Sequence, residues 1–271
     1  MTSEFPHLTF LKLGGSLITD KDTPRTPRRE VIERLCREIE EALNLHPGLP
    51  LVLGHGSGSF GHSAARKHGT RQGVTGKQGW LGFAEVWKEA RTLNQIVVEA
   101  LINAGLPVIA FPPSAGVLAH NGQVLRWELA PMRAALAAGL IPLVNGDTIF
   151  DEQRGGTILS TEDLFIHLAR QLHPRRILLS GLEAGVWADF PTCTQLIPSI
   201  TPENFARVAR QVGGSASVDV TGGMIEKVRT MLALAEELPG LEAVIFSGAE
   251  AGAVKDVLLG ERSGTVISTA L

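Results

Sequence analysis

The sequence has little of several features that mark whole classes of protein. It holds 25 lysines and arginines against 28 acidic residues, so the basic excess typical of a nucleic-acid-binding protein is missing. No apolar run approaches the roughly 18–20 residues that a membrane-spanning helix needs. The segment Met1–Leu8 lacks a basic stretch followed by an apolar core, so we expect no signal peptide. These absences predict a protein with neither a nucleic-acid nor a membrane partner.

Cysteine is scarce as well. Cys36 and Cys193 form no metal-binding motif, and so few cysteines suit a reducing cytoplasm, which is the expected location. The phosphate-binding loop GxxxxGK[ST], the metal motif HExxH, the pairs CxxC and G-x-S-x-G, and the protein-kinase motif set are all absent. Any catalytic site must therefore lie in other clusters of the 271 residues.

Short apolar runs alternate with amphipathic stretches along the chain, which predicts a mostly parallel sheet with helices on both faces. The expected strands are Leu8–Leu13, Leu51–Leu53, Val108–Phe111, Ile141–Val144, Ile177–Leu179, Ala243–Phe246 and Thr265–Ile267. The expected helices are Arg28–Leu45, Trp80–Ala104, Leu129–Ala138, Thr161–Leu172, Pro202–Val212 and Gly222–Leu238. In such a fold, ligands bind beyond the carboxyl ends of the strands.

Two shorter segments also carry a prediction. Thr148–Phe150 and Gly156–Leu159 flank a turn and predict a β-hairpin. The glycine-rich and basic stretch Lys67–Gly79 predicts a mobile loop. A soft boundary near residue 175 separates two coupled halves of a single domain.

Glycine clusters follow the first two predicted strands. Gly14-Gly15 comes directly after Lys12-Leu13, where glycine lets backbone N–H groups approach an anion and the lysine can reach the same phosphates. An ordinary tight turn explains the pair equally well. The second cluster, Gly54–His62, precedes an expected helix whose N-terminus attracts phosphate. Its formal G-x-G-x-x-G match is weak evidence for NAD, because no acidic residue follows before Glu85.

His62 and a third cluster point to the same chemistry. A protonated histidine near a helix N-terminus is disfavoured unless an anion compensates, and bound phosphate would do so; a neutral capping histidine is the alternative. In the segment Asp219–Lys227, Thr221 or Gly222 can cap a helix on which Lys227 lies one turn from Gly223. This pattern offers backbone donors and a cation, although a plain helix cap with an exposed lysine would have the same sequence.

Together these stretches resemble the amino acid kinase superfamily and, within it, the isopentenyl phosphate kinase family. The matching segments are LKLGGSLITDK (Leu11–Lys21), HGSGSFGH (His55–His62), NGDTIFD (Asn145–Asp151), DVTGGMIEK (Asp219–Lys227) and the C-terminal Phe246–Ile267. The resemblance implies an α/β fold, a three-layer αβα sandwich. It also implies transfer of the γ-phosphoryl group of ATP, with Mg²⁺, to isopentenyl phosphate in the alternate mevalonate route of isoprenoid biosynthesis. A homodimer is a further implication, as are an acceptor lobe over about residues 1–174 and an ATP lobe over about 175–271.

The resemblance also assigns roles by matching position. The residues assigned to ATP are Lys12, Gly14, Gly15, Ser16, Ser57, Gly223 and Lys227. The residues assigned to the acceptor are Gly56, Gly61 and His62 for its phosphate, Phe83 and Val86 for the isoprenoid tail, and Thr161, which lies near Asp163 and would face the acceptor. The catalytic residues would be Lys12, Lys21, His62 and Asp163, with Asp163 organising the lysines. Phe83 and Val86 are explained nearly as well as ordinary helix core.

The sequence departs from the family pattern in three places. Gly56-Ser57-Gly58 replaces the usual triple glycine, and Thr161-Glu162-Asp163 replaces Gly-Asp-Asp, which we interpret as retention of the second acid. Leu182–Val186 replaces the acid-rich Asp-Val-Asp-Gly-Val near the nucleotide. Two other functions stay open: a fosfomycin-kinase-like enzyme acting on a small phosphonate, and a non-catalytic sensor of phosphorylated ligands. Phe83, Val86, Trp80 and Trp87 favour an apolar tail slot over the former.

Overall fold

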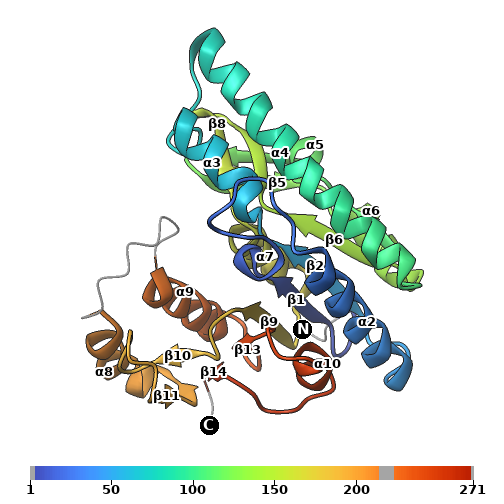
Figure 1. The fold of residues 1–271 in the computed structure, drawn as a ribbon, viewed down its shortest axis with the longest axis vertical. Helices are drawn as coiled ribbons and strands as arrows, with labels where there is room; N and C mark the ends of the chain where they lie inside the picture. The colour runs from blue at the N-terminus through green and yellow to red at the C-terminus, as the bar shows by residue number, and fades with distance from the viewer. Residues whose placement is uncertain (1–3, 214–222, 270–271) are drawn as a thin grey trace.

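The protein is built around an eight-stranded sheet, described by a computed structural model that covers residues 4–213 and 223–269 (Figure 1). The strands lie in the order β12 (Ser199–Ile200), β14 (Thr265–Ile267), β13 (Glu242–Ser247), β9 (Arg176–Gly181), β1 (Thr9–Leu13), β2 (Leu51–His55), β6 (Ile141–Asn145) and β3 (Val108–Ala110). The six strands from β13 to β3 are mutually parallel, whereas β14 pairs antiparallel with β13. This confirms the predicted α/β architecture.

Each face of the sheet is covered by helices because successive strand residues point to opposite sides. In β1, Phe10 joins one hydrophobic cluster, and Leu11 and Leu13 join the other. The first cluster is completed by α6 (Ala130–Ala137), α7 (Thr161–Leu172), α8 (Pro202–Gly213) and α9 (Gly223–Glu237). The second is completed by α1 (Gly15–Ile18), α2 (Arg29–Leu45), α3 (Gly58–His68), α4 (Gly76–Asn103) and α10 (Ala253–Leu258). The result is the αβα sandwich.

A second sheet extends the structure beyond β6. Its order is β5 (Gln123–Trp127), β4 (Val117–His120), β7 (Asp147–Asp151) and β8 (Gly155–Leu159), and the short α5 (Pro113–Gly116) precedes it. β7 and β8 pair antiparallel, which confirms the predicted hairpin. A small ribbon, β10 (Val186–Trp187) with β11 (Leu196–Ile197), follows the carboxyl end of β9.

The predicted loop at Lys67–Gly79 is wrong in extent. α3 continues to His68 and α4 begins at Gly76, so the connection is a turn of residues 69–75. Gly69 caps the C-terminus of α3 with a left-handed backbone (φ 61°), a conformation that glycine adopts without the steric penalty of a side chain. The turn is hydrogen-bonded to the β7–β8 hairpin through the Val74 N–H and the Arg154 carbonyl oxygen, 2.8 Å apart.

Candidate active site

The carboxyl ends of the parallel strands bring the first two glycine clusters together. The Gly14 N–H donates to the Ser180 carbonyl oxygen near the carboxyl end of β9 (2.9 Å), and the Gly56 N–H donates to the Leu13 carbonyl oxygen (3.0 Å). A Cβ atom on Gly15 would lie 2.5 Å from the Gly58 nitrogen, so the two loops pack backbone against backbone. This close approach requires glycine whether or not a phosphate binds there. It leaves the loops side by side at the edge where ligands of such sheets bind.

Two lysines meet one carboxylate beside these loops. Nζ of Lys12, from β1, lies 2.9 Å from Oε1 of Glu162 at the start of α7, and Nζ of Lys227, from α9, lies 3.8 Å from the same oxygen. The Lys12 side chain is 10% exposed and that of Glu162 23%. Desolvation by burial raises the pKa of Glu162, but the charges of Lys12 and Lys227 outweigh it and lower that pKa to about 2. The carboxylate thus stays charged and holds both ammonium groups at one point.

The residue that organises the lysines is therefore Glu162, and the prediction of this contact for Asp163 is wrong. Asp163 instead closes a capping box at the N-terminus of α7. Its Oδ2 accepts from the N–H and the hydroxyl of Ser160, both at 2.8 Å, and its own N–H donates to the Ser160 Oγ. Two adjacent acids start this helix, and Glu162 faces β1 while Asp163 faces back to Ser160. The Ser160-x-x-Asp163 spacing is the sequence signal for the cap.

Thr161 makes a contact that the sequence did not predict. Its side chain is buried, and its hydroxyl donates to the His55 carbonyl oxygen at 2.6 Å. The hydroxyl therefore ties the start of α7 to the end of β2. The structure gives Thr161 a positioning role that the sequence pattern did not indicate.

His55 lies buried beneath the second glycine loop. Its Nδ1 is 3.1 Å from the Gly56 carbonyl oxygen and its Nε2 is 3.0 Å from the Asn94 Oδ1 on α4. Desolvation by burial lowers the pKa of His55, and the nearby charge of Lys12 lowers it further, whereas the two hydrogen bonds raise it. Since the net direction is downward, the imidazole is neutral at neutral pH and adds no charge to the site.

The other predicted site residues border this edge. Ser16 lies in α1, and Gly61 is buried in the first turns of α3, where a Cβ atom would lie 2.7 Å from that of Ser57. His62 follows in α3 with its side chain exposed, and Lys21 is exposed between α1 and α2. Gly223 is the first residue of α9; the predicted cap at Thr221 or Gly222 lies outside the described residues.

An aromatic group covers the β7–β8 hairpin. The Phe83 ring on α4 lies 5.4 Å from that of Trp80 and 5.3 Å from that of Phe150 on β7, measured between centroids. Phe83 and Val86 are buried, whereas Phe150 is 50% exposed and Trp80 39%. The hairpin therefore presents an open aromatic edge backed by Phe83, which fits an apolar ligand segment.

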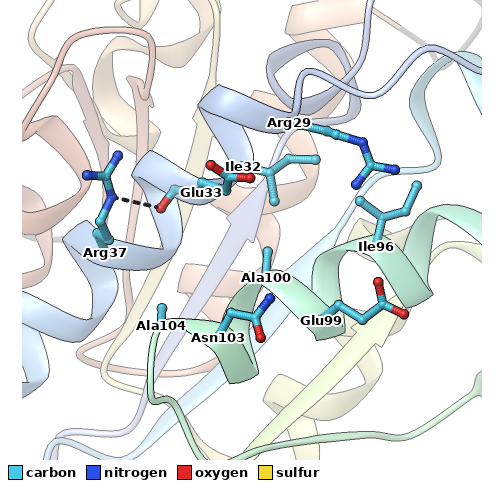
Figure 2. A pocket seen from close by; sticks show the side chains of 9 residues that line it. All are labelled: Arg29, Ile32, Glu33, Arg37, Ile96, Glu99, Ala100, Asn103 and Ala104. Carbon is cyan, nitrogen blue, oxygen red and sulfur yellow. Dashed lines mark hydrogen bonds between the residues drawn. The ribbon is translucent and has the colours of Figure 1, made fainter.

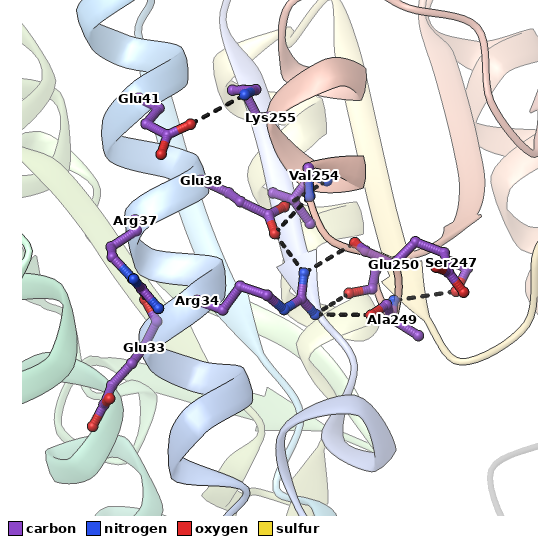
Figure 3. A network of polar contacts seen from close by, with 12 residues as sticks. Glu33, Arg34, Arg37, Glu38, Glu41, Ser247, Ala249, Glu250, Val254 and Lys255 are labelled. Atoms are coloured by element: carbon purple, nitrogen blue, oxygen red, sulfur yellow. Dashed lines mark hydrogen bonds and ion pairs between the residues drawn. The ribbon is translucent and has the colours of Figure 1, made fainter.

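The loop after β13 is held by α2, as Figure 3 shows. The Arg34 guanidinium donates to the carbonyl oxygens of Gly248 (2.7 Å), Ala249 (3.2 Å) and Glu250 (3.0 Å). The buried Glu38 carboxylate accepts from Arg34 and from the N–H groups of Gly252 and Val254, each at 3.0 Å. Neither Arg34 nor Glu38 was singled out from the sequence.

That loop in turn contacts the altered segment after β9. The Ser247 hydroxyl donates to the Leu182 carbonyl oxygen at 3.2 Å, and Glu183 accepts from the indole N–H of Trp187 at 3.0 Å. The segment Leu182–Ala184 is thus fixed by hydrogen bonds to its neighbours, and it carries the single acid Glu183 where the family pattern has two aspartates.

A hollow of about 290 Å³ lies elsewhere, between α2 and α4 (Figure 2). Its charged lining residues include Arg29, Glu33, Arg37 and Glu99, and it contains none of the predicted site residues. Since these residues sit along the helices rather than at the strand ends, we do not assign the catalytic site to this hollow. Among the described residues, no group of three or more His, Cys, Asp and Glu side chains could hold a metal ion, and no helix could cross a membrane.

Comparison with known proteins relates this geometry to one family. The model of the amino acid kinase family matches residues 7–247. The chain is 32% identical to the isopentenyl phosphate kinase of Methanocaldococcus jannaschii, over 96% of this chain and 98% of the relative. It is 36% identical to that of Haloferax volcanii, over 96% and 98%.

A solved structure supports the same relationship. X-ray structures of isopentenyl phosphate kinase superimpose with a TM-score of 0.81 at 31% identity, covering 97% of this chain and all of the other. A UMP kinase from Bacillus anthracis, with a TM-score of 0.63 at 17% identity, shares the fold alone. The chain therefore belongs to the amino acid kinase family and, within it, to the isopentenyl phosphate kinases.

Proposed function

We propose that the protein transfers the γ-phosphoryl group of ATP to isopentenyl phosphate and so produces isopentenyl diphosphate for isoprenoid biosynthesis. The observation that carries this proposal is the convergence of Lys12, Glu162 and Lys227 beside the two glycine loops. Two phosphate-bearing substrates repel each other, and cations with backbone N–H donors offset this repulsion. The family relationship supplies the choice of substrates.

In the proposed reaction, a phosphate oxygen of the acceptor attacks the γ-phosphorus of ATP. The bond from that phosphorus to the β–γ bridging oxygen breaks, and ADP leaves with the electron pair. Lys12 and Lys227 would stabilise the charge on the transferring group, and Glu162 keeps the two ammonium groups in place. Because Glu162 remains ionised and paired, we assign it positioning and not proton removal.

The remaining roles are part of the same proposal. Backbone groups of Gly14, Gly15 and Ser16 would bind the ATP phosphates, with Ser57 and Gly223 beside them. Lys21 would help neutralise the charge of the transition state. Gly56, Gly61 and His62 would bind the acceptor phosphate, and Phe83 with Val86 would line the tail site. The exposed position of His62 on the first turns of α3 supports this assignment.

Mg²⁺ is proposed to enter with ATP. The described residues offer no cluster of three metal ligands, so phosphate oxygens would hold the ion, with Lys12 and Lys227 as the protein's own cations nearby. Bound in that way, Mg²⁺ would neutralise phosphate charge. We also propose a homodimer in the cytoplasm; the unpaired cysteines, Cys36 and Cys193, suit that compartment.

The experiment that tests the proposed function is a coupled assay of ADP release with Mg–ATP and four acceptor conditions. These are isopentenyl phosphate, dimethylallyl phosphate, fosfomycin and no acceptor. We expect clear preference for isopentenyl phosphate, because the aromatic group of Trp80, Phe83 and Phe150 suits an apolar tail. Preference for fosfomycin would show that the acceptor is a small phosphonate and would rule out the proposed tail site. Absence of turnover with every acceptor, together with retained ligand binding, would instead establish a sensor.

A further inference from the structure

Arg71 lies in the turn between α3 and α4 and has no role in the site as described so far. Its side chain is 46% exposed. The turn rests on the β7–β8 hairpin, whose other contacts include the aromatic group: a Cβ atom on Gly156 of β8 would lie 2.8 Å from the Phe83 ring. One hairpin thus supports both the turn that carries Arg71 and the proposed tail site.

The main chain of Arg71 is fixed to that hairpin. The buried Thr157 hydroxyl donates to the Arg71 carbonyl oxygen at 2.9 Å, and the Arg154 guanidinium donates to the same oxygen at 3.3 Å. The side chain therefore extends from a rigid base, so little backbone freedom is lost when its guanidinium binds a ligand.

The guanidinium itself is held loosely. One of its nitrogens lies 3.5 Å from the Asp163 Oδ2, longer than the roughly 2.7–2.9 Å of a strong charge-assisted hydrogen bond. That oxygen already accepts two hydrogen bonds of 2.8 Å from Ser160. Arg71 can move away from Asp163 without leaving that carboxylate unpaired, because the two hydrogen bonds from Ser160 remain.

This loose contact places Arg71 against the first turn of α7. The preceding residue, Glu162, binds Lys12 and Lys227, and Thr161 ties the same turn to the end of β2. Arg71 therefore approaches the phosphate-binding edge from the hairpin side, whereas the two lysines approach it from β1 and α9.

We propose that Arg71 is a phosphate-binding residue for the acceptor, moving from Asp163 to the acceptor phosphate when that substrate enters. This inference rests on the proposed function. The planar guanidinium presents paired N–H donors that match two phosphate oxygens, which a lysine cannot do. The exchange replaces a long contact to one carboxylate oxygen by shorter contacts to a phosphate group.

The test compares Arg71→Ala, Arg71→Lys and Asp163→Asn with the wild-type protein. Steady-state assays give the KM for isopentenyl phosphate and the KM for ATP separately, and calorimetry gives the affinity for isopentenyl phosphate without ATP. For Arg71→Ala we expect the acceptor KM to rise about tenfold and the ATP KM to change by less than about twofold. The acceptor KM of Arg71→Lys should lie between those of the wild type and Arg71→Ala, because lysine retains the charge but lacks the paired N–H donors of the guanidinium.

Asp163→Asn is the matched control because it weakens the same ion pair from the other side. It should lower the urea midpoint of unfolding through its helix cap and leave the acceptor KM within about threefold of the wild type. An unchanged acceptor KM in Arg71→Ala overturns the proposal. Equal increases in the acceptor KM for Arg71→Ala and Asp163→Asn also overturn it, because they identify a structural pair. A different result would refute the proposed function itself: a wild-type protein that neither binds nor phosphorylates isopentenyl phosphate. The proposal for Arg71 would then be refuted as well.

Discussion

Replacing Glu162 by glutamine removes the charge that holds two lysines together while keeping the shape of the side chain. The charges of Lys12 and Lys227 lower the pKa of Glu162 from the usual 4.5 to about 2 against the opposing effect of desolvation. That difference corresponds to roughly 3 kcal/mol in favour of the ionised carboxylate in the folded protein. We therefore expect Glu162→Gln to lower the free energy of unfolding at pH 7 by about 3 kcal/mol.

The pH dependence gives the same prediction a second check. A carboxylate whose pKa is depressed by folding stabilises the protein above its unfolded value of 4.5, and this stabilisation is lost as the pH falls toward about 2. Urea unfolding of wild type and Glu162→Gln at pH 7, 5, 4 and 3 measures the difference between their free energies of unfolding, which we call the stability gap. The gap should be constant from pH 7 to 5 and should narrow below that.

Kinetics then connect the contact to catalysis. Glu162→Gln should lower kcat, since the two ammonium groups lose their shared partner, whereas Asp163→Asn should change mainly stability, by about 1 kcal/mol through its cap. The reasoning is refuted if Glu162→Gln unfolds like the wild type at pH 7, or if the gap fails to narrow between pH 5 and 3. It is also refuted if Asp163→Asn lowers kcat as much as Glu162→Gln does.

Two further predictions concern histidines. His62→Ala should reduce turnover at least about tenfold, because it removes one charge-assisted contact to the acceptor phosphate. The urea midpoint of unfolding should change little, because the side chain is exposed. Normal turnover in this variant would show that His62 does not bind the acceptor. His55 has a pKa lowered by folding, so the unfolded chain binds its proton more tightly and stability declines as the pH falls below about 6.5, by up to about 1.4 kcal/mol per pH unit. His55→Gln should decline less than the wild type between pH 7.5 and 5.5 in urea unfolding, and parallel curves would contradict this.

The sequence predicted the main sheet well because its strands are short apolar runs bounded by glycine. Strands buried on both faces, such as Leu51–His55, stand out from the amphipathic helices around them. Two-residue strands such as Leu196–Ile197 and the one-turn helix Pro113–Gly116 carry too little periodicity to be identified in this way.

The candidate site was predictable by segment and less so by side chain. Lys12 and Lys227 do converge, as the pattern of lysines and glycines suggested. Which of two adjacent acids they meet depends on the rotation of α7, which is set by the Ser160 cap and by the buried Thr161 hydroxyl. Arg71 could not be identified, because its contact with Asp163 joins residues 92 positions apart through a turn predicted to be a loose loop.

The position of β1 in the sheet has a consequence for the proposed two-lobe division. The first strand of the chain lies between β2 and β9, so a seam of hydrogen bonds joins the N-terminal segment to the strand that opens the C-terminal half. A fragment that begins near residue 175 would have to fold with one side of β9 unpaired, and β13 alone would remain beside it. Exchange of C-terminal halves between relatives therefore requires that the β1–β9 hydrogen bonds be kept intact, and the C-terminal half cannot be treated as an independent module.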